Sequence, residues 1–563
     1  MLLLLPACGG NDKPVNITDP APPDDPVSLE IEPAWQSVEK GEAAYFTVTA
    51  INTEFIVGEN SAGCSKTDDT LISCATDAAA VGNHGITVTA TAKPSETKTA
   101  TLNITDPAPP EEPLITGSII SVVGNVGGYQ TQNVVLNKII WSDSVGAFTV
   151  SAQLPTGAGL PISSSAPSPY VFSFFNQAAS GAQPRVALTD YTYTLGAAGA
   201  SDFWFYDPTG EGWELKGHAG PDDMPRNAGK IANIRYNDTP YLVAADYDSL
   251  NNEGGTLWLL SMDEYDNYAK VKSLSIPNKG DYQAHVVDVF VDGSRIFILL
   301  AYFNIGEIGY EQAYMKSELR QYKLTGAGAG IAFEQVGAAV FLGENAGKLV
   351  PYTSGSDKYL FIPCRGGSYS GGGDNNGENS SISMVNITQD ISLSTTERKA
   401  YVGGAYSASA PLYDFQDIAI ASNGTTYVLT QGYDVDWNAE WMLYQTTAEN
   451  LVSLANAVPN ITINNFNNND AFLIRTDKNF NGYFWAIGIC SNGADEYMVF
   501  AKSAGASSAS ANGDELHFLK VGAAWSDYAN SANSIISTDV LNAGAGGEGF
   551  GINSIAILPV GIK

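Results

Sequence analysis

A unit of strand, tight turn, strand, long loop and strand recurs along the chain, and this recurrence limits the fold more than any other feature. The clearest copy runs from Phe415 to Leu451. Its first apolar run ends at Ser422-Asn423-Gly424, and an Asn-Gly pair suits a hairpin turn because both residues adopt positive φ at little cost. Thr425 to Leu429 is a β-branched and aromatic run, and Trp441 to Tyr444 resumes as a strand after a polar loop. The pattern predicts a β-meander.

Four further segments show the same order of strand, turn, strand, loop and strand. Their first strands are expected at Ile231–Tyr236, Val286–Val291, Leu349–Thr353 and Phe472–Thr476. In the last copy, Tyr483–Ile489 is the expected second strand. First strands recur roughly every 55 to 70 residues, and no helical period separates them. Sheets that follow one another without helices close best as a β-propeller, with a stacked sandwich as the alternative.

The number of blades depends on how the ring closes. Ile552–Leu558 has the pattern of a first strand, yet the chain ends soon after it. Its partners must therefore come from the start of the array. If Tyr170–Asn176 and Phe203–Tyr206 supply them, the ring has six blades. Leu114 to Leu154 is also strand-rich and about one blade long, so counting it gives seven, which we favour.

The N-terminus carries an export signature. Residues 1–7 are rich in leucine and end Leu5-Pro6-Ala7 before Cys8. This resembles the lipobox of bacterial lipoproteins, although Pro6 departs from its usual small or aliphatic residue. The resemblance implies a lipidated Cys8 and places the protein at the bacterial outer membrane or cell surface, with the lipid as its only membrane contact. The apolar run is short for an export signal and lacks a basic leader, so we expect the natural start to lie upstream.

A repeated linker outlines a small domain. Residues 8–26 are rich in Pro, Asp, Asn and Gly and are expected to form an extended tether. The octapeptide NITDPAPP occurs at Asn16–Pro23 and again at Asn103–Pro110. The two copies bracket residues 27–105, where Phe-Thr-Val and Ile-Thr-Val-Thr-Ala runs alternate as strands do. These runs resemble the bacterial Ig-like domains of surface proteins. The resemblance implies a β-sandwich that acts as a spacer. A direct role in adhesion is the more specific alternative.

The remaining segments follow from these boundaries. Residues 106–113 are a Pro-rich linker, and residues 114–563 are the expected propeller, so the predicted fold class is all-β. Cys64 and Cys74 bracket a polar loop, and in an exported protein they are expected to form a hairpin disulfide. Cys364 and Cys490 are expected at the ends of second strands, as buried free thiols.

The amino-acid composition and net charge limit the kinds of molecule that the protein can bind. The chain has 563 residues, 44% of them hydrophobic and 16% charged, which is normal for a folded protein. Its net charge is −32, so phosphate backbones and anionic membrane surfaces are repelled, and nucleic acid is excluded as a partner. The acidity attracts Ca²⁺, but it is also ordinary for a soluble secreted protein.

In a propeller, the loops between second and third strands share one face with the links between blades. Here these loops are long and polar, whereas the opposite hairpins are mostly tight turns, and binding surfaces are usually built in this way. The candidate ligand-binding residues are Asp246, Asp248, Tyr310, Arg365, Tyr369, Asp374, Asp434, Asp436 and Trp437. Arg365 could clamp a carboxylate, or it could pair with one of the many acidic residues. Trp437 lies among hydrogen-bonding groups as in a sugar site, or it packs its loop onto the blade.

Asp246, Asp248, Asn251 and Glu253 offer closely spaced oxygen ligands for Ca²⁺, and no other cofactor is indicated. A solvated acidic loop is the favoured alternative. The four histidines form no zinc motif, and the chain contains neither a GxSxG elbow nor a P-loop. We therefore expect a non-enzymatic binding module for a glycan, a peptide or an envelope protein. A surface glycan hydrolase or lyase, with two carboxylates drawn from the loops, and a structural envelope protein are the alternatives.

The lipobox resemblance leads to the first testable prediction. Cys8→Ala should abolish incorporation of radiolabelled palmitate into the protein expressed with its natural leader in a bacterial host, because the thiol is the acylated group. Cys64→Ala is the matched control and should be labelled as strongly as the wild type. Labelling that persists in Cys8→Ala would contradict the anchor.

Overall fold

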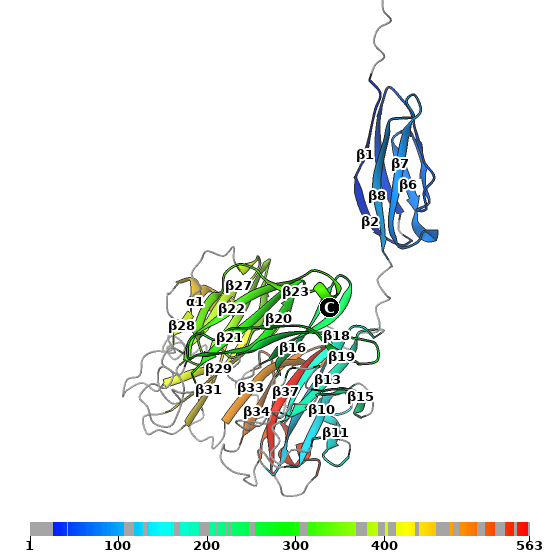
Figure 1. Cartoon of the computed structure of the whole chain (residues 1–563). Helices are drawn as coiled ribbons and strands as arrows, with labels where there is room; N and C mark the ends of the chain where they lie inside the picture. Colours follow the sequence, from blue (N-terminus) through cyan, green and yellow to red (C-terminus); the bar gives the residue numbers. More distant parts are fainter. Residues whose placement is uncertain are drawn as a thin grey trace, which may run out of the picture. The chain divides into compact units, whose positions relative to one another are not determined.

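The chain divides into two compact units, Met1–Glu112 and Pro113–Lys563 (Figure 1). The computed structural model describes residues 26–105 except 42, and residues 117–560 except 128–131, 159, 163–168, 180, 191–202, 209–211, 221–222, 224, 226–227, 247–253, 305–313, 367–379, 392–399, 403–411, 434–438, 458–472, 477–482, 504–512, 524–534 and 545–548. The described elements are mostly strands, so the all-β prediction is confirmed. Among the described residues, no helix combines the length and the apolar character that crossing a bilayer requires.

The first unit is a sandwich of two four-stranded sheets. One sheet has the order β1 (Ser28–Glu32), β3 (Ala43–Ile51), β6 (Leu71–Ala75) and β5 (Cys64–Lys66). The other has the order β2 (Trp35–Glu39), β8 (Thr97–Thr105), β7 (Gly82–Ala90) and β4 (Phe55–Val57). Phe46 and Val48 alternate inward from the first sheet, and Ile86 and Val88 from the second, which forms the core between them.

The two cysteines of this unit lie directly opposite each other. Cys64 on β5 pairs with Cys74 on β6 across the antiparallel ladder, and the two sulfurs are joined in a disulfide. Both residues also belong to the core of the sandwich. The second NITDPAPP copy begins inside β8, because Asn103 to Thr105 form the end of that strand.

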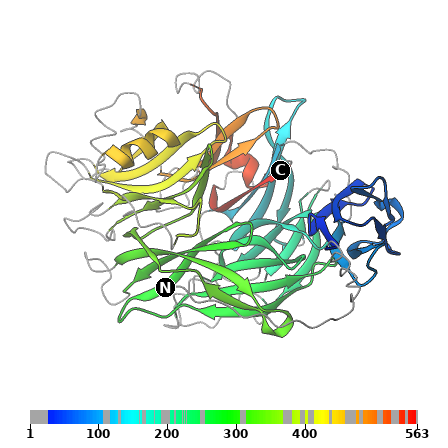
Figure 2. The same ribbon diagram turned by 90° about the horizontal axis from the view of Figure 1, so that it is seen from above.

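The described part of the second unit contains seven antiparallel sheets, and Figure 2 shows them arranged around a common centre. In each sheet, numbered here in ring order, the innermost strand is given first. Sheet 1 contains β37 (Phe550–Val560), β9 (Gly117–Val126), β10 (Val134–Ser142) and β11 (Ala147–Pro155). Sheet 2 contains β12 (Pro169–Asn176), β13 (Gln183–Asp190), β14 (Phe203–Asp207) and β15 (Glu214–Ala219). Sheet 3 contains β16 (Ala228–Tyr236), β17 (Thr239–Asp246), β18 (Thr256–Met262) and β19 (Tyr268–Ser275).

Sheets 4 to 7 continue the series. Sheet 4 contains β20 (Gln283–Asp292), β21 (Arg295–Phe303), β22 (Tyr314–Thr325) and β23 (Ala332–Gln335), and β24 (Val340–Glu344) also pairs with β22. Sheet 5 contains β25 (Val350–Ser354), β26 (Asp357–Cys364), β27 (Ser381–Asn386) and β28 (Ala400–Val402). Sheet 6 contains β29 (Leu412–Ile420), β30 (Thr425–Tyr433), β31 (Ala439–Thr447) and β32 (Leu473–Thr476). Sheet 7 contains β33 (Tyr483–Ser491), β34 (Glu496–Ser503), β35 (Glu515–Lys520) and β36 (Ile535–Ile536).

Seven apolar clusters fill the seven interfaces between consecutive sheets, including the interface between sheet 7 and sheet 1. The arrangement is therefore a β-propeller, as predicted. The last strand closes the ring: β37 pairs along its length with β9 from the start of the unit. The number of sheets in the described residues equals the larger of the two expected blade counts.

Two details of the predicted ring closure are corrected by the structure. Tyr170–Asn176 lies within β12 and Phe203–Tyr206 within β14, and both strands belong to sheet 2, so they do not pair with the final strand. The segment Leu114 to Leu154 supplies those partners instead, as β9, β10 and β11.

In the last of the five predicted copies, the strand positions within the blade are wrong by one strand. Leu473–Thr476 is the outer strand of sheet 6, and Tyr483–Ile489 lies in β33, which is the inner strand of sheet 7 rather than a second strand. The hairpin that follows β33 turns at Asn492-Gly493. Cys490 is consequently on an inner strand, whereas Cys364 is at the end of a second strand as predicted. Both thiols are free and buried, and burial raises the pKa of the Cys364 thiol to about 11.

The opposite hairpins are also less uniform than predicted. Tight turns do connect the first and second strands at positions such as Gly293, Gly355 and Gly424. The third-to-fourth connection of sheet 6, however, contains a helix, α1 (Ala448–Ala457). Ala448 and Leu451 of this helix are buried in the cluster between sheets 5 and 6. A further short helix, α4 (Thr538–Leu541), precedes β37.

A recurrent bulge in the inner strands positions side chains that join neighbouring sheets. The pairing register shifts at equivalent places in β20 and β29, and an aspartate follows each shift. Asp288 accepts hydrogen bonds from the backbone N–H of Val289 and, ahead of the next sheet, from Leu349 (both 2.7 Å). Asp417 accepts one from Ile487 in sheet 7 at 2.9 Å. One carboxylate thus holds the main chains of two blades together.

A buried ion pair joins sheets 2 and 3 near the face that carries the tight hairpins. Arg185 of β13 donates two hydrogen bonds of 2.9 Å, from Nε and Nη2, to the two carboxylate oxygens of Asp266. Tyr268 Oη (2.7 Å) and Asn176 Nδ2 (2.8 Å) also donate to Asp266 Oδ1. Burial alone would raise the pKa of the Asp266 carboxyl, but these donors outweigh it and hold the pKa below its usual value.

Asp266→Asn should destabilise the protein by about 3 to 5 kcal/mol, because it leaves the Arg185 guanidinium buried without its counter-charge. Asp238→Asn is the matched control: Asp238 also has a positive φ (60°, against 61° for Asp266) but is exposed at a hairpin. It should change stability by less than about 0.5 kcal/mol. Urea unfolding followed by tryptophan fluorescence measures both.

The pH dependence provides a second check on the same pair. Because the folded-state pKa of Asp266 is lowered, its contribution is present above the unfolded-state pKa of about 4 and is lost as the pH falls through the folded-state value. The stability difference between wild type and Asp266→Asn should therefore be widest near neutral pH and narrow in acid. A difference that is equal at both pH values would contradict the ionic account.

Candidate functional site

The candidate site is the loop face of the second unit, where the second strand of each blade ends and the third begins. Many of the predicted ligand-binding side chains lie outside the described residues: Asp248, Asn251, Glu253, Tyr310, Tyr369, Asp374, Asp434, Asp436 and Trp437. Cys8 lies outside them as well. The structure places Asp246 as the last residue of β17 and Arg365 directly after β26, so both lie at this face on different blades.

Asp246 differs from the picture of a solvated acidic loop. It pairs with Thr256 and Ala228 in sheet 3, and its side chain is buried, with a relative exposure of 5%. A buried carboxylate is oriented by its surroundings, whereas a solvated one is not. Within the described residues, no group of three or more His, Cys, Asp or Glu side chains could hold a metal ion. The predicted Ca²⁺ site therefore remains a prediction that depends on Asp248, Asn251 and Glu253.

Arg365 combines a fixed backbone with an exposed side chain that makes no ion pair to the described residues. Its N–H donates to the Asn345 carbonyl at 3.0 Å, and the N–H of Gly366, which has a φ of 80°, donates to the Glu344 carbonyl at 3.1 Å. The segment is thus held at the end of β26, while the Arg365 side chain is exposed. A guanidinium offers five donors in a planar fork, which suits carboxylates and vicinal hydroxyl groups.

The other arginines whose side chains the structure describes have partners within the protein. Arg185 pairs with Asp266, and Arg320 pairs with Glu318 at 2.7 Å. Arg295 contacts Asp292 and donates to the Ile387 carbonyl, and Arg235 donates to the Asp238 carbonyl. These four arginines act in the scaffold, which sets Arg365 apart.

A buried polar cluster below the loop face of sheet 4 was missed by sequence reasoning. Glu318 of β22 is buried and ion-pairs with Arg320 and with Lys279, which lies on the link from sheet 3. Tyr302 Oη donates to Glu318 Oε2 at 2.9 Å, and the Lys279 ammonium lies 4.3 Å from the centre of the Tyr302 ring. Glu318 and Arg320 are two residues apart on one strand, so the period of two could have indicated that they share a face.

This cluster keeps its carboxylate ionised. Burial alone would raise the pKa of the Glu318 carboxyl, but the hydrogen bonds from Lys279, Arg320 and Tyr302 hold it below its usual value. A carboxylate with a lowered pKa and four donor contacts is a poor general acid, because its proton would be lost at neutral pH. Glu318 instead attaches the link that carries Lys279 to the end of β21.

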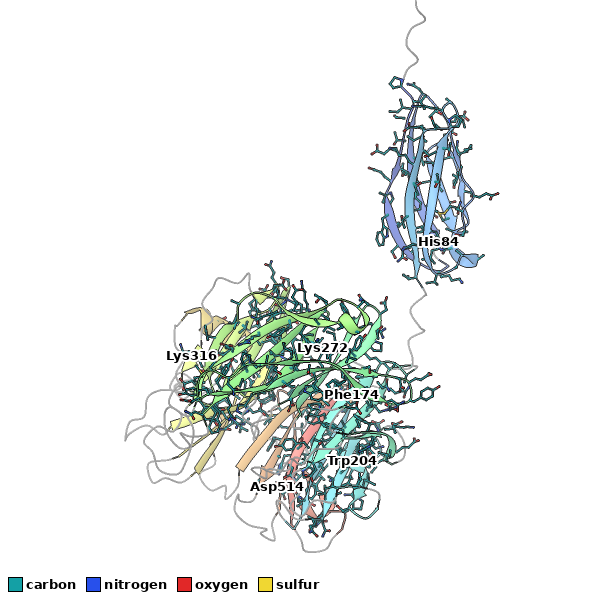
Figure 3. All side chains as sticks on the ribbon, viewed as in Figure 1. His84, Phe174, Trp204, Lys272, Lys316 and Asp514 are labelled. Atoms are coloured by element: carbon teal, nitrogen blue, oxygen red, sulfur yellow. A yellow bond between two sulfur atoms is a disulfide. The ribbon has the colours of Figure 1, made fainter. Side chains whose placement is uncertain are left out.

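The histidines serve local packing. His84 of the first unit (Figure 3) bridges two polar groups. Its Nδ1 lies 2.7 Å from Ser61 Oγ, and its Nε2 lies 2.7 Å from the Ala80 carbonyl oxygen. His517 lies 3.0 Å from Glu515 and stacks on Phe500. His285 is buried in β20 beside Phe303.

Comparison with known proteins finds only remote structural similarity. No protein-family model and no curated protein matches the chain. Among solved structures, an ancestral GH74 enzyme is similar over 62% of this chain and 36% of its own, at 13% identity and a TM-score of 0.33, so the similarity spans about a third of that enzyme. A levansucrase mutant of B. megaterium is similar over 55% and 85% of the two chains at 9% identity (TM-score 0.29). A GH32 β-fructofuranosidase of Bombyx mori is similar over 68% and 85% at 10% identity (TM-score 0.28).

Glu318→Gln should destabilise the protein by about 3 to 5 kcal/mol, because two cations then lie beside a neutral group in a buried cluster. Glu334→Gln is the matched control in the same sheet. It removes an exposed pair with Lys323, whose side chains are 49% and 55% accessible, and should cost less than about 1 kcal/mol. Thermal unfolding of both variants measures the difference, and equal losses would show that Glu318 is not a buried charge anchor.

Proposed function

We propose that the second unit is a non-enzymatic binding module that takes a polar ligand, foremost a glycan, on its loop face. A lipid on Cys8 would hold the protein at a bacterial cell surface, and the first unit, which resembles an Ig-like domain, would be the spacer between the two. The observation that carries the proposal is Arg365, which is exposed at the loop face while the other described arginines are used within the scaffold.

The buried carboxylates favour binding over catalysis. General acid catalysis needs a carboxyl group whose pKa is raised toward neutrality and whose proton faces the substrate. Asp266 and Glu318 have lowered pKa values and are occupied by cations. The pKa of Asp288 is raised by burial, but its oxygens accept hydrogen bonds from the main chain of sheet 4 and of the link to sheet 5, so the group has a role in joining blades.

A surface glycan hydrolase or lyase is the rival function, and its two carboxylates would come from loops outside the described residues, such as Asp374 and Asp434. A structural envelope protein is the third possibility. The three differ in two measurable properties, which are retention of a ligand and turnover of that ligand.

A glycan array combined with a reducing-end assay on the retained sugars separates these functions. We expect retention without release of new reducing ends, because Arg365, an exposed charged group on the described part of the loop face, is a hydrogen-bond donor and cannot act as a general acid at neutral pH. New reducing ends would favour the hydrolase, and the absence of any retained glycan together with retention on a peptide array would move the ligand class to peptides.

Single substitutions test which face of the propeller binds the ligand. Arg365→Ala and Trp437→Ala should each weaken binding by about 1 to 3 kcal/mol, the scale of a lost charged hydrogen bond or aromatic anchor. Ser294→Ala and Thr425→Ala, at the first-to-second-strand hairpins of the opposite face, should leave binding unchanged. If the hairpin variants lose binding and the loop variants keep it, the ligand binds the opposite face.

A further inference from the structure

The outer face of one sheet in the first unit has an unusual composition. Figure 1 shows β2, β8 and β7 side by side in this sheet, and β4 completes it. The register places Trp35 opposite Thr101 and Thr101 opposite Gly85. The next row of the same face contains Ser37, Asn103 and Asn83. An aromatic ring thus shares a flat surface with hydroxyl and amide groups.

Alternation shows that these side chains point away from the core. Leu102 and Ile86 are buried in the sandwich, and Val38 packs against it, so their neighbours along each strand face outward. Trp35 has a relative exposure of 59%, although tryptophan is usually mostly buried. On the far edge of the face, Ile56 of β4 is similarly exposed at 57%.

The described side chains between these two residues carry no charge. They are serine, threonine, asparagine and glycine: Ser37, Asn83, Gly85, Thr87, Thr89, Thr97, Thr99, Thr101 and Asn103. The outer face of the other sheet differs, because Glu30 and Glu32 lie beside its exposed Tyr45 strand. In a chain with a net charge of −32, this set of uncharged described side chains distinguishes the two sheets.

The polar groups of this face are organised and in part available. Asn103 Nδ2 donates to Ser37 Oγ at 3.1 Å, and the hydroxyls of Thr87 and Thr99 are 3.0 Å apart. These contacts orient the side chains along the sheet. Thr101 and Asn83 make no side-chain hydrogen bond to other described residues, so their groups can bind a ligand.

We propose that this face binds a neutral polysaccharide, with a sugar ring stacked on the Trp35 indole and its hydroxyl groups bonded to Thr101, Asn103 and Asn83. Among the described side chains of the face, an anionic polymer would meet no cation, and a cationic one would meet no carboxylate. Glu39, opposite Thr105 in the register, stands at the end of β2, two positions beyond Ser37. A protein partner needs a contiguous apolar core, whereas Trp35 and Ile56 lie on opposite edge strands with threonines between them. The proposal is independent of any ligand on the second unit.

Affinity gel electrophoresis of the full chain tests this site. The probes are gels cast with hydroxyethylcellulose, xyloglucan, galactomannan or dextran, all neutral, and with carboxymethylcellulose as the anionic comparison. We expect retarded migration in at least one neutral gel and weaker retardation in carboxymethylcellulose. Trp35→Ala should lower the apparent affinity at least tenfold and Asn103→Ala severalfold, while thermal unfolding stays near wild type because Trp35 is exposed.

Tyr45→Ala is the matched control, since it removes an equally exposed aromatic ring (53%) from the opposite sheet of the same unit. It should migrate as the wild type does. The loss of retardation caused by Trp35→Ala should be the same in an Arg365→Ala background as in the wild-type background, which separates this site from any ligand on the propeller. The proposal is overturned if no neutral gel retards the wild type, if carboxymethylcellulose retards it most, if Trp35→Ala migrates as wild type, or if Tyr45→Ala loses as much affinity.

Discussion

Every sheet of the second unit buries both of its faces, and the rest of the propeller depends on this constraint. Along β21, Ile298 and Leu300 enter the cluster shared with sheet 3, whereas Phe297 and Leu299 enter the one shared with sheet 5. A second strand such as β21 must therefore be apolar at consecutive positions, which a sheet with one solvated face avoids. A ring satisfies this requirement for every sheet only if it closes, and the pairing of β37 with β9 achieves that closure. An open array would leave the faces of its first and last sheets exposed to water, at about 25 cal/mol for each Å² of apolar surface.

Burial on both sides also determines where charge is tolerated. A charged group between two sheets loses its hydration and must recover that free energy from partners on both of them. Two described ion pairs follow this rule: Arg185 and Asp266 join sheets 2 and 3, and Lys348, on the link into sheet 5, pairs with Asp417 of sheet 6. The bulge in the inner strands adds backbone partners, because it turns a carboxylate such as Asp288 toward the next main chain. These contacts favour one alignment of each blade against the next, which apolar packing alone does not specify.

The sequence predicts the strands well and their grouping less well. Turn residues and consecutive apolar positions identify four of the five copies, and the final strand INSIAIL is correctly expected to close the ring. The error at residues 472–489 has a local cause: Asn481-Gly482 and Asn492-Gly493 are both hairpin signals, and only the second lies in a hairpin of sheet 7. A link between blades and a turn within one use the same residues, so spacing cannot separate them. The pairing of Arg185 with Asp266 spans 81 residues and depends on the ring geometry, which no local pattern encodes.

The scarcity of cations also bears on the two proposed ligand-binding surfaces. Cations are scarce in this chain, with 28 lysines and arginines against 60 acidic residues, and the described arginines between blades are needed to neutralise carboxylates. An exposed arginine at the end of β26 is therefore better placed to act on a ligand than to stabilise the fold, because its backbone is already held by Asn345 and Glu344. The first unit shows the reverse case. The described side chains on the outer face of its β2–β8–β7–β4 sheet carry no charge, so recognition by them must come from stacking on Trp35 and from neutral hydrogen bonds. Two surfaces with such different chemistry would bind different ligands, or different parts of one heterogeneous polymer.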